Sequence, residues 1–117
     1  MLVSEYLPFV ETYRVGDAGA VLHALGDPTR RAVFECLGRG PRAVGQLAGE
    51  LPVSRPAVSQ HLKVLKSAGL VVDEAVGTRR LYRLNPPALE GIQQYFAQFW
   101  TQALSSFKDA VEEQEEQ

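Results

Sequence analysis

Polar and basic side chains recur at helical spacing between residues 53 and 70. At about 100° per residue, a helix here would place Val58, Leu62 and Leu65 on one face. The opposite side collects polar and basic residues, namely Pro56, Ser59, Gln60, Lys63 and Ser67, with Arg55 and Lys66 at its edge. Serine and glutamine can donate to and accept from base edges in a major groove, and arginine and lysine can bind guanine or phosphate. The segment therefore has a predicted core side and a predicted side for reading DNA, with a merely solvated face as the alternative.

Three arginines follow in a stretch that alternates as a strand does. Residues 70–76 and 79–84 favour strands, and Gly77-Thr78 between them is typical of a hairpin turn. Alternation places Arg80 on one side of this hairpin and Arg79 and Arg83 on the other, so only part of the charge can face one surface. At least one arginine near the tip is expected to reach the backbone or minor groove of flanking DNA. A hairpin that serves only solubility is the alternative.

The other reactive side chains form no recognisable catalytic or metal-binding pattern. His61 lies between the two faces of the 53–70 segment and lacks a nucleophile and an orienting carboxylate, so we interpret it as a packing residue that can also touch a phosphate. Cys36 is the single cysteine, which removes internal disulfides and multi-cysteine metal motifs, and we interpret it as a small buried residue. No enzyme, catalytic residue, metal site or cofactor is therefore predicted.

Capping and terminating residues indicate the helices that must position these side chains. A capping side chain accepts from free amides at a helix start, proline is favoured in the first turn, and glycine often ends a helix. These signals predict helices from Asp17 to Gly26, Asp27 to Gly38, residues 45–51, and Ser54 to Gly69. A short helix, a tight corner and a longer helix form the helix-turn-helix pattern. The predicted fold class is mainly α with a small β-hairpin (α+β), a winged helix-turn-helix.

Arg30 and Arg31 fall in the first turn of the second predicted helix, where cations oppose the helix dipole. Such a placement needs a reason. Phosphate contact is one explanation, and an ion pair from Arg31 to Glu35 or from Arg30 to Asp27 is an equal one.

A last helix, from about residue 87 to about residue 111, is predicted to carry an apolar stripe. Its members recur at spacings of three and four and include Leu89, Ile92, Tyr95, Phe96, Phe99, Trp100, Ala103, Leu104 and Phe107. A small winged-helix core cannot cover so much apolar surface. A two-fold homodimer solves this, with Leu22 joining the interface and the two reading helices about 34 Å apart. An aromatic ligand pocket in the stripe is the lesser alternative.

The formal net charge of −2 hides a basic middle between acidic ends. Residues 28–83 hold ten Lys or Arg against four Asp or Glu, a balance of +6, while residues 1–27 sum to −3 and residues 84–117 to −5. For a polyanionic partner, this distribution matters more than the total. One domain is expected, divided into an extension (1–16), a winged-helix core (17–85), a dimerisation helix (86–111) and an acidic, frayed tail (112–117). No membrane span or signal peptide is predicted, so a cytoplasmic location is expected.

Three stretches, "ALGDPTRRAVFECLGRG", "PVSRPAVSQHLKVLKSAGLV" and "GTRRLYRLN", together closely resemble the ArsR family of bacterial winged-helix repressors. The match runs from about Gly19 to Asn85. The resemblance implies a homodimer that binds double-stranded DNA at an inverted-repeat operator and represses transcription. It assigns operator contact to Ser54, Arg55, Ala57, Ser59, Gln60 and His61, and wing contact to Arg79 and Arg80; the wheel adds Lys63.

Many relatives in that family sense metals, and this sequence departs from them at the positions concerned. The segment "AVGQLAGEL" has no cysteine where arsenic and cadmium sensors carry a Cys-x-Cys pair, and the last helix has no histidine. A non-metal-sensing regulator is therefore expected, with its effector unknown. A metal- or redox-responsive repressor with an unrecognised site and a winged-helix module for protein contact are the alternatives.

Overall fold

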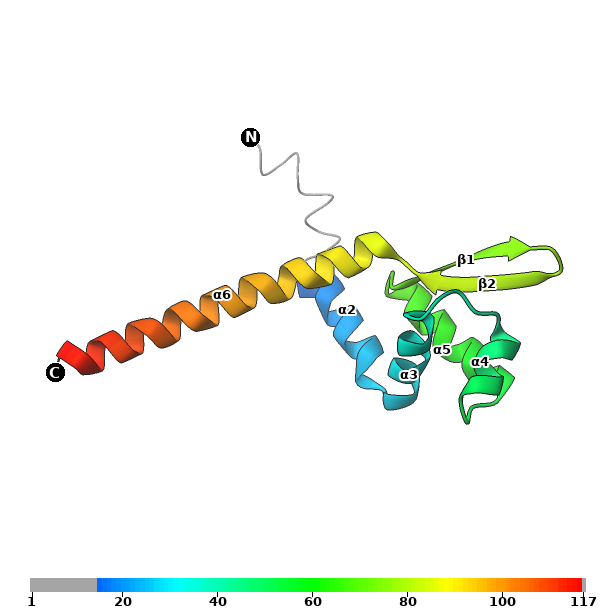
Figure 1. The fold of residues 1–117 in the computed structure, drawn as a ribbon, viewed down its shortest axis with the longest axis horizontal. Coiled ribbons are helices and arrows are strands. Elements are labelled where there is room, and N and C mark those ends of the chain that lie inside the picture. Colours follow the sequence, from blue (N-terminus) through cyan, green and yellow to red (C-terminus); the bar gives the residue numbers. More distant parts are fainter. Residues whose placement is uncertain (1–14, 117) are drawn as a thin grey trace, which may run out of the picture.

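The computed structural model of the chain describes residues 15–116. In chain order the elements are α2 (Val15–Gly26), α3 (Pro28–Leu37), α4 (Val44–Glu50), α5 (Arg55–Ser67), β1 (Val71–Val76), β2 (Arg79–Leu84) and α6 (Pro86–Glu116). Helices α2 to α5 form the body, the hairpin projects from one end, and α6 extends away at the other (Figure 1). The winged helix-turn-helix prediction is confirmed. The extension predicted at residues 1–16 lies outside the described residues, apart from residues 15 and 16, which begin α2.

The capping signals in the sequence are satisfied in the fold. The Oδ2 atom of Asp27 accepts from the backbone N–H of Arg30 at 2.8 Å, which caps α3. The Oγ atom of Ser54 accepts from the backbone N–H of Ala57 at 3.3 Å, which caps α5. After α5, Gly69 takes a φ of 80°, the left-handed conformation that lets the chain reverse into the wing.

One buried face of α5 forms the centre of the core. Val58, Leu62 and Leu65 are between 0 and 1% exposed, as the helical wheel predicted. Around them are buried side chains from every other element of the body: Val21, Ala24, Val33, Cys36, Leu37, Leu47, Leu70 and Val71. Burial of this apolar surface is the main favourable term that holds α5 in place, and it leaves the opposite face of the helix free.

The wing is a regular antiparallel pair whose base is tied to the body. Val71 pairs with Leu84 at the base and Val76 with Arg79 at the tip, with Gly77 at a φ of 63° in the turn. An isolated bridge joins Arg42 to Tyr82 through two backbone hydrogen bonds of 3.0 and 2.9 Å. The brief strand expected near residue 42 is therefore this bridge, and it fixes the direction in which the wing leaves the body.

Two details of the first helices differ from the prediction. Helix α2 already includes Val15, so Asp17 lies within the helix and does not cap it. The guanidinium of Arg30 donates from Nε to the carbonyl of Ala24 at 2.6 Å, and that of Arg31 donates from Nη1 to the carbonyl of Leu25 at 3.0 Å. The last carbonyls of a helix lack partners within it, so both arginines stabilise the end of α2. This role is neither of the two explanations that the sequence offered.

Helix α6 is longer than expected and touches the body only near its start. Ala88 and Ile92 pack against the core and Gly91 is buried, whereas the residues from Phe96 to Glu115 are exposed. The helix continues through the acidic residues to Glu116, where a frayed tail was predicted. Glutamate is a good helix former, and Lys108 lies 4.0 Å from Glu112 one turn later. No helix in the described part of the chain is both long enough and apolar enough to span a membrane.

Candidate nucleic-acid interface

The outer face of α5 presents the polar side chains predicted to read DNA. Ser54, Arg55, Ser59, Gln60 and Lys63 are exposed, and they lie opposite the buried face of the helix. Because the core fixes that buried face, the rotation of α5 about its axis is fixed as well. The predicted residues therefore stand together on one surface, with rotamers free to adapt to a partner.

Ala57 and His61 lie at the flank of α5 and are half-buried. The Nδ1 atom of His61 is 4.0 Å from the Oδ2 atom of Asp27, the residue that caps α3. The backbone N–H of Arg30 is the largest of the effects that hold the pKa of Asp27 below its usual value, and the charge of His61 adds to it. His61 thus connects α5 to the start of α3, in agreement with its interpretation as a packing residue.

The guanidinium of Arg55 lies against α4. A Cβ atom at Gly45 would come within 2.9 Å of the Nη2 atom of Arg55, so the absence of a side chain at Gly45 makes room for this arrangement. Arg55 also lines a groove of about 450 Å³ between α4 and the wing, together with Ala43, Val44, Gly45, Gln46, Arg79, Arg80 and Tyr82. Three guanidinium groups from two separate elements therefore converge where an anion could bind. Sequence reasoning missed Gln46, because nothing local indicates that the start of α4 faces the wing.

The two arginines next to the wing turn have different surroundings. The Nη1 atom of Arg80 is 2.9 Å from the Oδ2 atom of Asp73, and the Nζ atom of Lys66 is 2.7 Å from the Oδ1 atom of the same carboxylate. Arg79 is exposed, and within residues 15–116 it takes part in no ion pair. Arg79 is thus the wing cation whose charge is not already matched by a carboxylate among these residues.

Comparison with known proteins identifies the kind of molecule to which this geometry belongs. Residues 25–74 match the family model described as a helix-turn-helix domain. The chain is 52% identical over 88% of its length to the HTH-type transcriptional regulator Rv2034 of Mycobacterium tuberculosis, and the match covers 94% of that protein. The ArsR-like transcriptional regulator from Rhodococcus sp. RHA1 has a similar structure, with a TM-score of 0.71 and 32% identity, over 81% of this chain and 92% of that one.

A second solved structure adds information about assembly. The solution structure of Mb0332 from Mycobacterium bovis, described as a homodimeric winged helix-turn-helix DNA-binding domain and a possible ArsR-family regulator, aligns with a TM-score of 0.60. It is 30% identical and the alignment covers 80% of this chain and 84% of that one. The chain belongs to the ArsR family. It is a sequence-specific DNA-binding transcriptional regulator and not an enzyme, and DNA binding and homodimerisation are typical of its family.

In this ArsR-family regulator, a polar network under the DNA-facing surface holds α4 in place. The Cys36 thiol donates to the Oε2 atom of Glu50 at 3.1 Å, and the Nε atom of Arg42 donates to the same oxygen at 3.1 Å. Burial and the neighbouring Glu50 raise the pKa of the Cys36 thiol, which keeps it protonated as a donor. Cys36 is fully buried, which confirms its interpretation as a small core residue.

The residues predicted for the dimer interface do not all have the same exposure. Leu22, Phe96, Phe99, Trp100 and Phe107 are between 47 and 68% exposed, and Ala103 is exposed as well. Ile92 and Tyr95 are half-buried, because they lie where α6 still contacts its own body. Leu104 and Val111 extend the exposed apolar face toward the end of α6.

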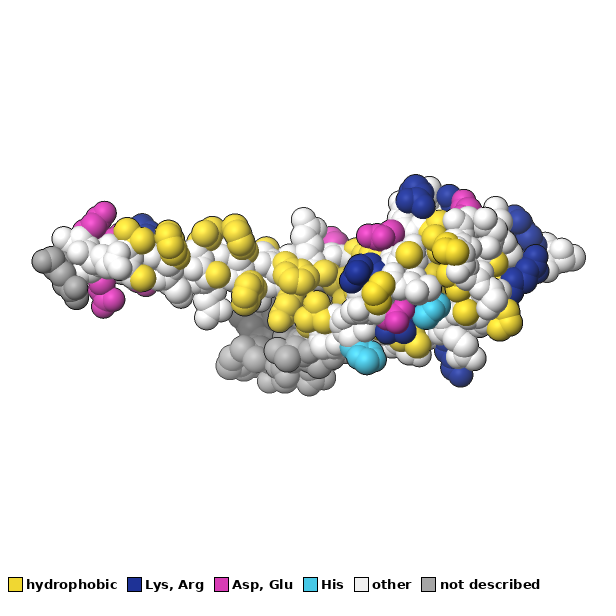
Figure 2. Space-filling model, turned by 90° about the horizontal axis from the view of Figure 1, so that it is seen from below, with side chains coloured by type: hydrophobic (Ala, Val, Ile, Leu, Met, Phe, Trp, Pro, Cys, Tyr) yellow, Lys and Arg dark blue, Asp and Glu magenta, His cyan; other side chains and the backbone are white. Residues whose placement is uncertain are grey.

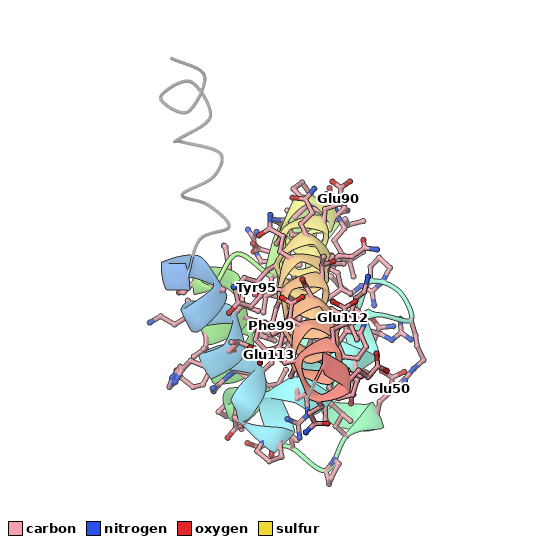
Figure 3. The ribbon with its side chains drawn as sticks, turned by 90° about the vertical axis from the view of Figure 1, so that its left-hand side faces the viewer. Glu50, Glu90, Tyr95, Phe99, Glu112 and Glu113 are labelled. Carbon is pink, nitrogen blue, oxygen red and sulfur yellow. The ribbon has the colours of Figure 1, made fainter. Side chains whose placement is uncertain are left out.

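The figures show how these two surfaces are arranged. Viewed along α6, Tyr95 and Phe99 lie on the side of the helix that faces α2 (Figure 3). In the space-filling view, hydrophobic side chains line the arm formed by α6, and Lys and Arg side chains gather at the opposite end, around the wing (Figure 2). The apolar face and the basic surface are thus well separated on one molecule.

Proposed function

We propose that this ArsR-family regulator is a homodimeric repressor that places one α5 in each of two successive major grooves of an inverted-repeat operator. The observation that carries the proposal is the exposed polar face of α5 beside the arginine-lined groove, both held rigidly by the core. The residues proposed to contact DNA are Ser54, Arg55, Ala57, Ser59, Gln60, His61, Lys63, Arg79 and Arg80. Occupancy of the operator by the dimer would exclude the transcription machinery from the same DNA.

The proposed contacts divide into base reading and positioning. Ser59, Gln60 and Lys63 lie on the outermost side of α5 and are assigned to base edges, because their side chains can donate, and the first two can also accept. Arg55 and Arg79 line the groove between α4 and the wing and are assigned to phosphates, which fix register without reading sequence. A phosphate in this groove would meet two cations from elements that are far apart in the chain.

The second copy is assigned to the exposed apolar face of α6. Solvent-exposed aromatic side chains in a continuous row are typical of an interaction site, and a two-fold axis lets the same row cover itself. The chain would then work as a reading unit (17–85) and a dimerisation helix (86–111), with residues 1–16 as an extension and an acidic end (112–117). A spacing of about 34 Å between the two α5 helices would match one turn of DNA.

Salt dependence of DNA binding tests the proposed phosphate contacts. Each lost phosphate contact lowers the slope of log K against log salt by about one, so Arg79→Ala should lower it by about two in a dimer. Lys108→Ala, on α6, removes the same charge far from the proposed interface and serves as the matched control. Fluorescence anisotropy from 50 to 300 mM salt measures the slope. If both variants keep the wild-type slope, Arg79 does not contact phosphate.

We further propose that this regulator belongs to a branch that does not respond to metals. No group of three or more His, Cys, Asp or Glu residues is clustered for metal binding within residues 15–116. The Cys36 thiol is buried and engaged with Glu50, which supports a structural role. Titration of zinc or cadmium into the protein–DNA complex tests the proposal. Release of DNA at micromolar metal would overturn it.

A further inference from the structure

Asp73 lies at the junction between α5 and the wing and binds a cation from each. Its side chain is only 8% exposed. Lys66, in the last turn of α5, approaches Oδ1 at 2.7 Å, and Arg80, near the start of β2, approaches Oδ2 at 2.9 Å. Each carboxylate oxygen therefore has its own partner, and the two partners come from the two elements proposed to hold DNA.

This arrangement turns Arg80 away from the wing tip. Ala75 is the residue opposite Arg80 in the ladder, and Asp73 is opposite Tyr82, so Arg80 reaches back diagonally toward the base of the hairpin. Arg79, on the other side of the strand, has no such partner within residues 15–116. Two adjacent arginines of the wing are thus unequal in their availability to a phosphate.

Asp73 also weakens the pull of Lys66 and Arg80 on a passing phosphate. A phosphate that recruits either cation must separate it from a carboxylate that is mostly excluded from water, where charge pairs are less screened than on the open surface. Binding to unrelated DNA depends on the number of phosphates neutralised, whereas operator binding also depends on the position of base-reading side chains. The carboxylate therefore opposes the first kind of binding more than the second.

We infer that Asp73 determines specificity: it holds Lys66 and Arg80 off the phosphate backbone and fixes the wing relative to α5, which lowers affinity for unrelated DNA more than for operator. The inference rests on the proposed placement of α5 and the wing on DNA. Asp73 is a positioning residue, because it acts through the two cations that it binds. Its chemistry predicts an unusual outcome, in which removal of a well-paired carboxylate increases binding to DNA of arbitrary sequence.

The test compares two DNA probes for the wild-type protein and Asp73→Asn. One probe is a duplex of about 30 base pairs selected by the wild-type protein from a random pool, and the other is a shuffled sequence of the same composition. One additional phosphate contact strengthens binding about fivefold near 150 mM salt. Asp73→Asn should therefore bind the shuffled duplex at least about fivefold tighter, with a slope against salt steeper by about one, while the selected duplex changes less. The ratio of the two affinities should fall.

Glu74→Gln is the matched control, because it removes the same charge from the next residue of β1, on the opposite and exposed side of the wing. If Glu74→Gln lowers the ratio as much as Asp73→Asn does, net charge explains the effect and the inference is wrong. An unchanged ratio in Asp73→Asn also overturns it. If the wild-type protein selects no sequence, the proposed function itself fails, which is a separate result.

A second set of variants remains informative even if Asp73→Asn destabilises the fold. Lys66→Gln and Arg80→Gln each remove a cation that Asp73 already holds, so each should leave affinity for the shuffled duplex nearly unchanged, in contrast to Arg79→Ala. A loss in either variant as large as that in Arg79→Ala would show that Asp73 does not hold these cations off phosphate.

Discussion

Replacement of Trp100 by aspartate tests whether the apolar face of α6 joins two copies of the chain. The Trp100 side chain is 62% exposed, and a tryptophan can bury up to about 250 Å², so about 150 Å² remains available for a partner. At about 25 cal/mol per Å², burial of that area contributes about 4 kcal/mol per protomer, or about 8 kcal/mol for two symmetric copies. Even half of this total corresponds to a dissociation constant about a thousandfold higher in Trp100→Asp.

Sedimentation equilibrium across a range of protein concentrations measures this dissociation constant. Thr101→Asp is the matched control: it introduces the same charge at the next position, on a part of α6 lined by Ala97, Gln98, Gln102 and Ser105. Thr101→Asp should remain dimeric, whereas Trp100→Asp should sediment as a monomer with an intact helical spectrum. A Trp100→Asp protein that dimerises as tightly as the wild type would place the interface elsewhere and refute the reasoning.

Two further predictions concern the body and its charges. Gly45→Ala should raise the melting temperature slightly, because alanine stabilises a helix by about 0.5–1 kcal/mol relative to glycine, yet weaken DNA binding severalfold, because the new Cβ displaces the Arg55 guanidinium; thermal melts and anisotropy on the same samples check both parts. Hydrogen bonds from Lys66, and then Arg80, hold the pKa of Asp73 below its model value of 3.8, so its contribution to stability is complete above that value and is lost as the pH falls through the lower folded-state value. Urea unfolding between about pH 5 and about pH 3 should show a smaller loss of stability in Asp73→Asn than in the wild type.

The sequence predicted those parts of the fold that depend on local signals. The caps Asp27 and Ser54 are determined by side chains a few residues from their acceptors, and the buried face of α5 follows from helical periodicity alone. The wing turn depends on Gly77, whose positive φ is accessible to glycine at little steric cost. These signals were enough to place the reading face of α5 and the hairpin correctly.

The parts that sequence reasoning missed depend on which elements meet in space. Arg30 and Arg31 cap the end of α2 because the corner between α2 and α3 is tight, and no residue pattern specifies the direction of their side chains. The position of Arg55 against Gly45 and the pairing of Arg80 with Asp73 similarly require the packing of α4, α5 and the wing. Wheel and strand alternation gave Arg79 and Arg80 equal standing, and only the tertiary contacts separate them.

These contacts also change what the charge count means. Residues 28–83 carry ten cationic side chains, yet Arg30 and Arg31 bind carbonyls, Arg42 pairs with Glu50, and Lys66 and Arg80 share Asp73. The acidic residues at the end of α6 lie about 45 Å along the helix from its start, at the end of the molecule away from the wing (Figure 1). They are therefore too far from the basic surface to be felt there at physiological salt. Attraction to DNA is thus governed neither by the total of −2 nor by the local +6, but by the few cations without an ion-pair partner within residues 15–116, which are Arg55, Lys63, Arg79 and Arg83.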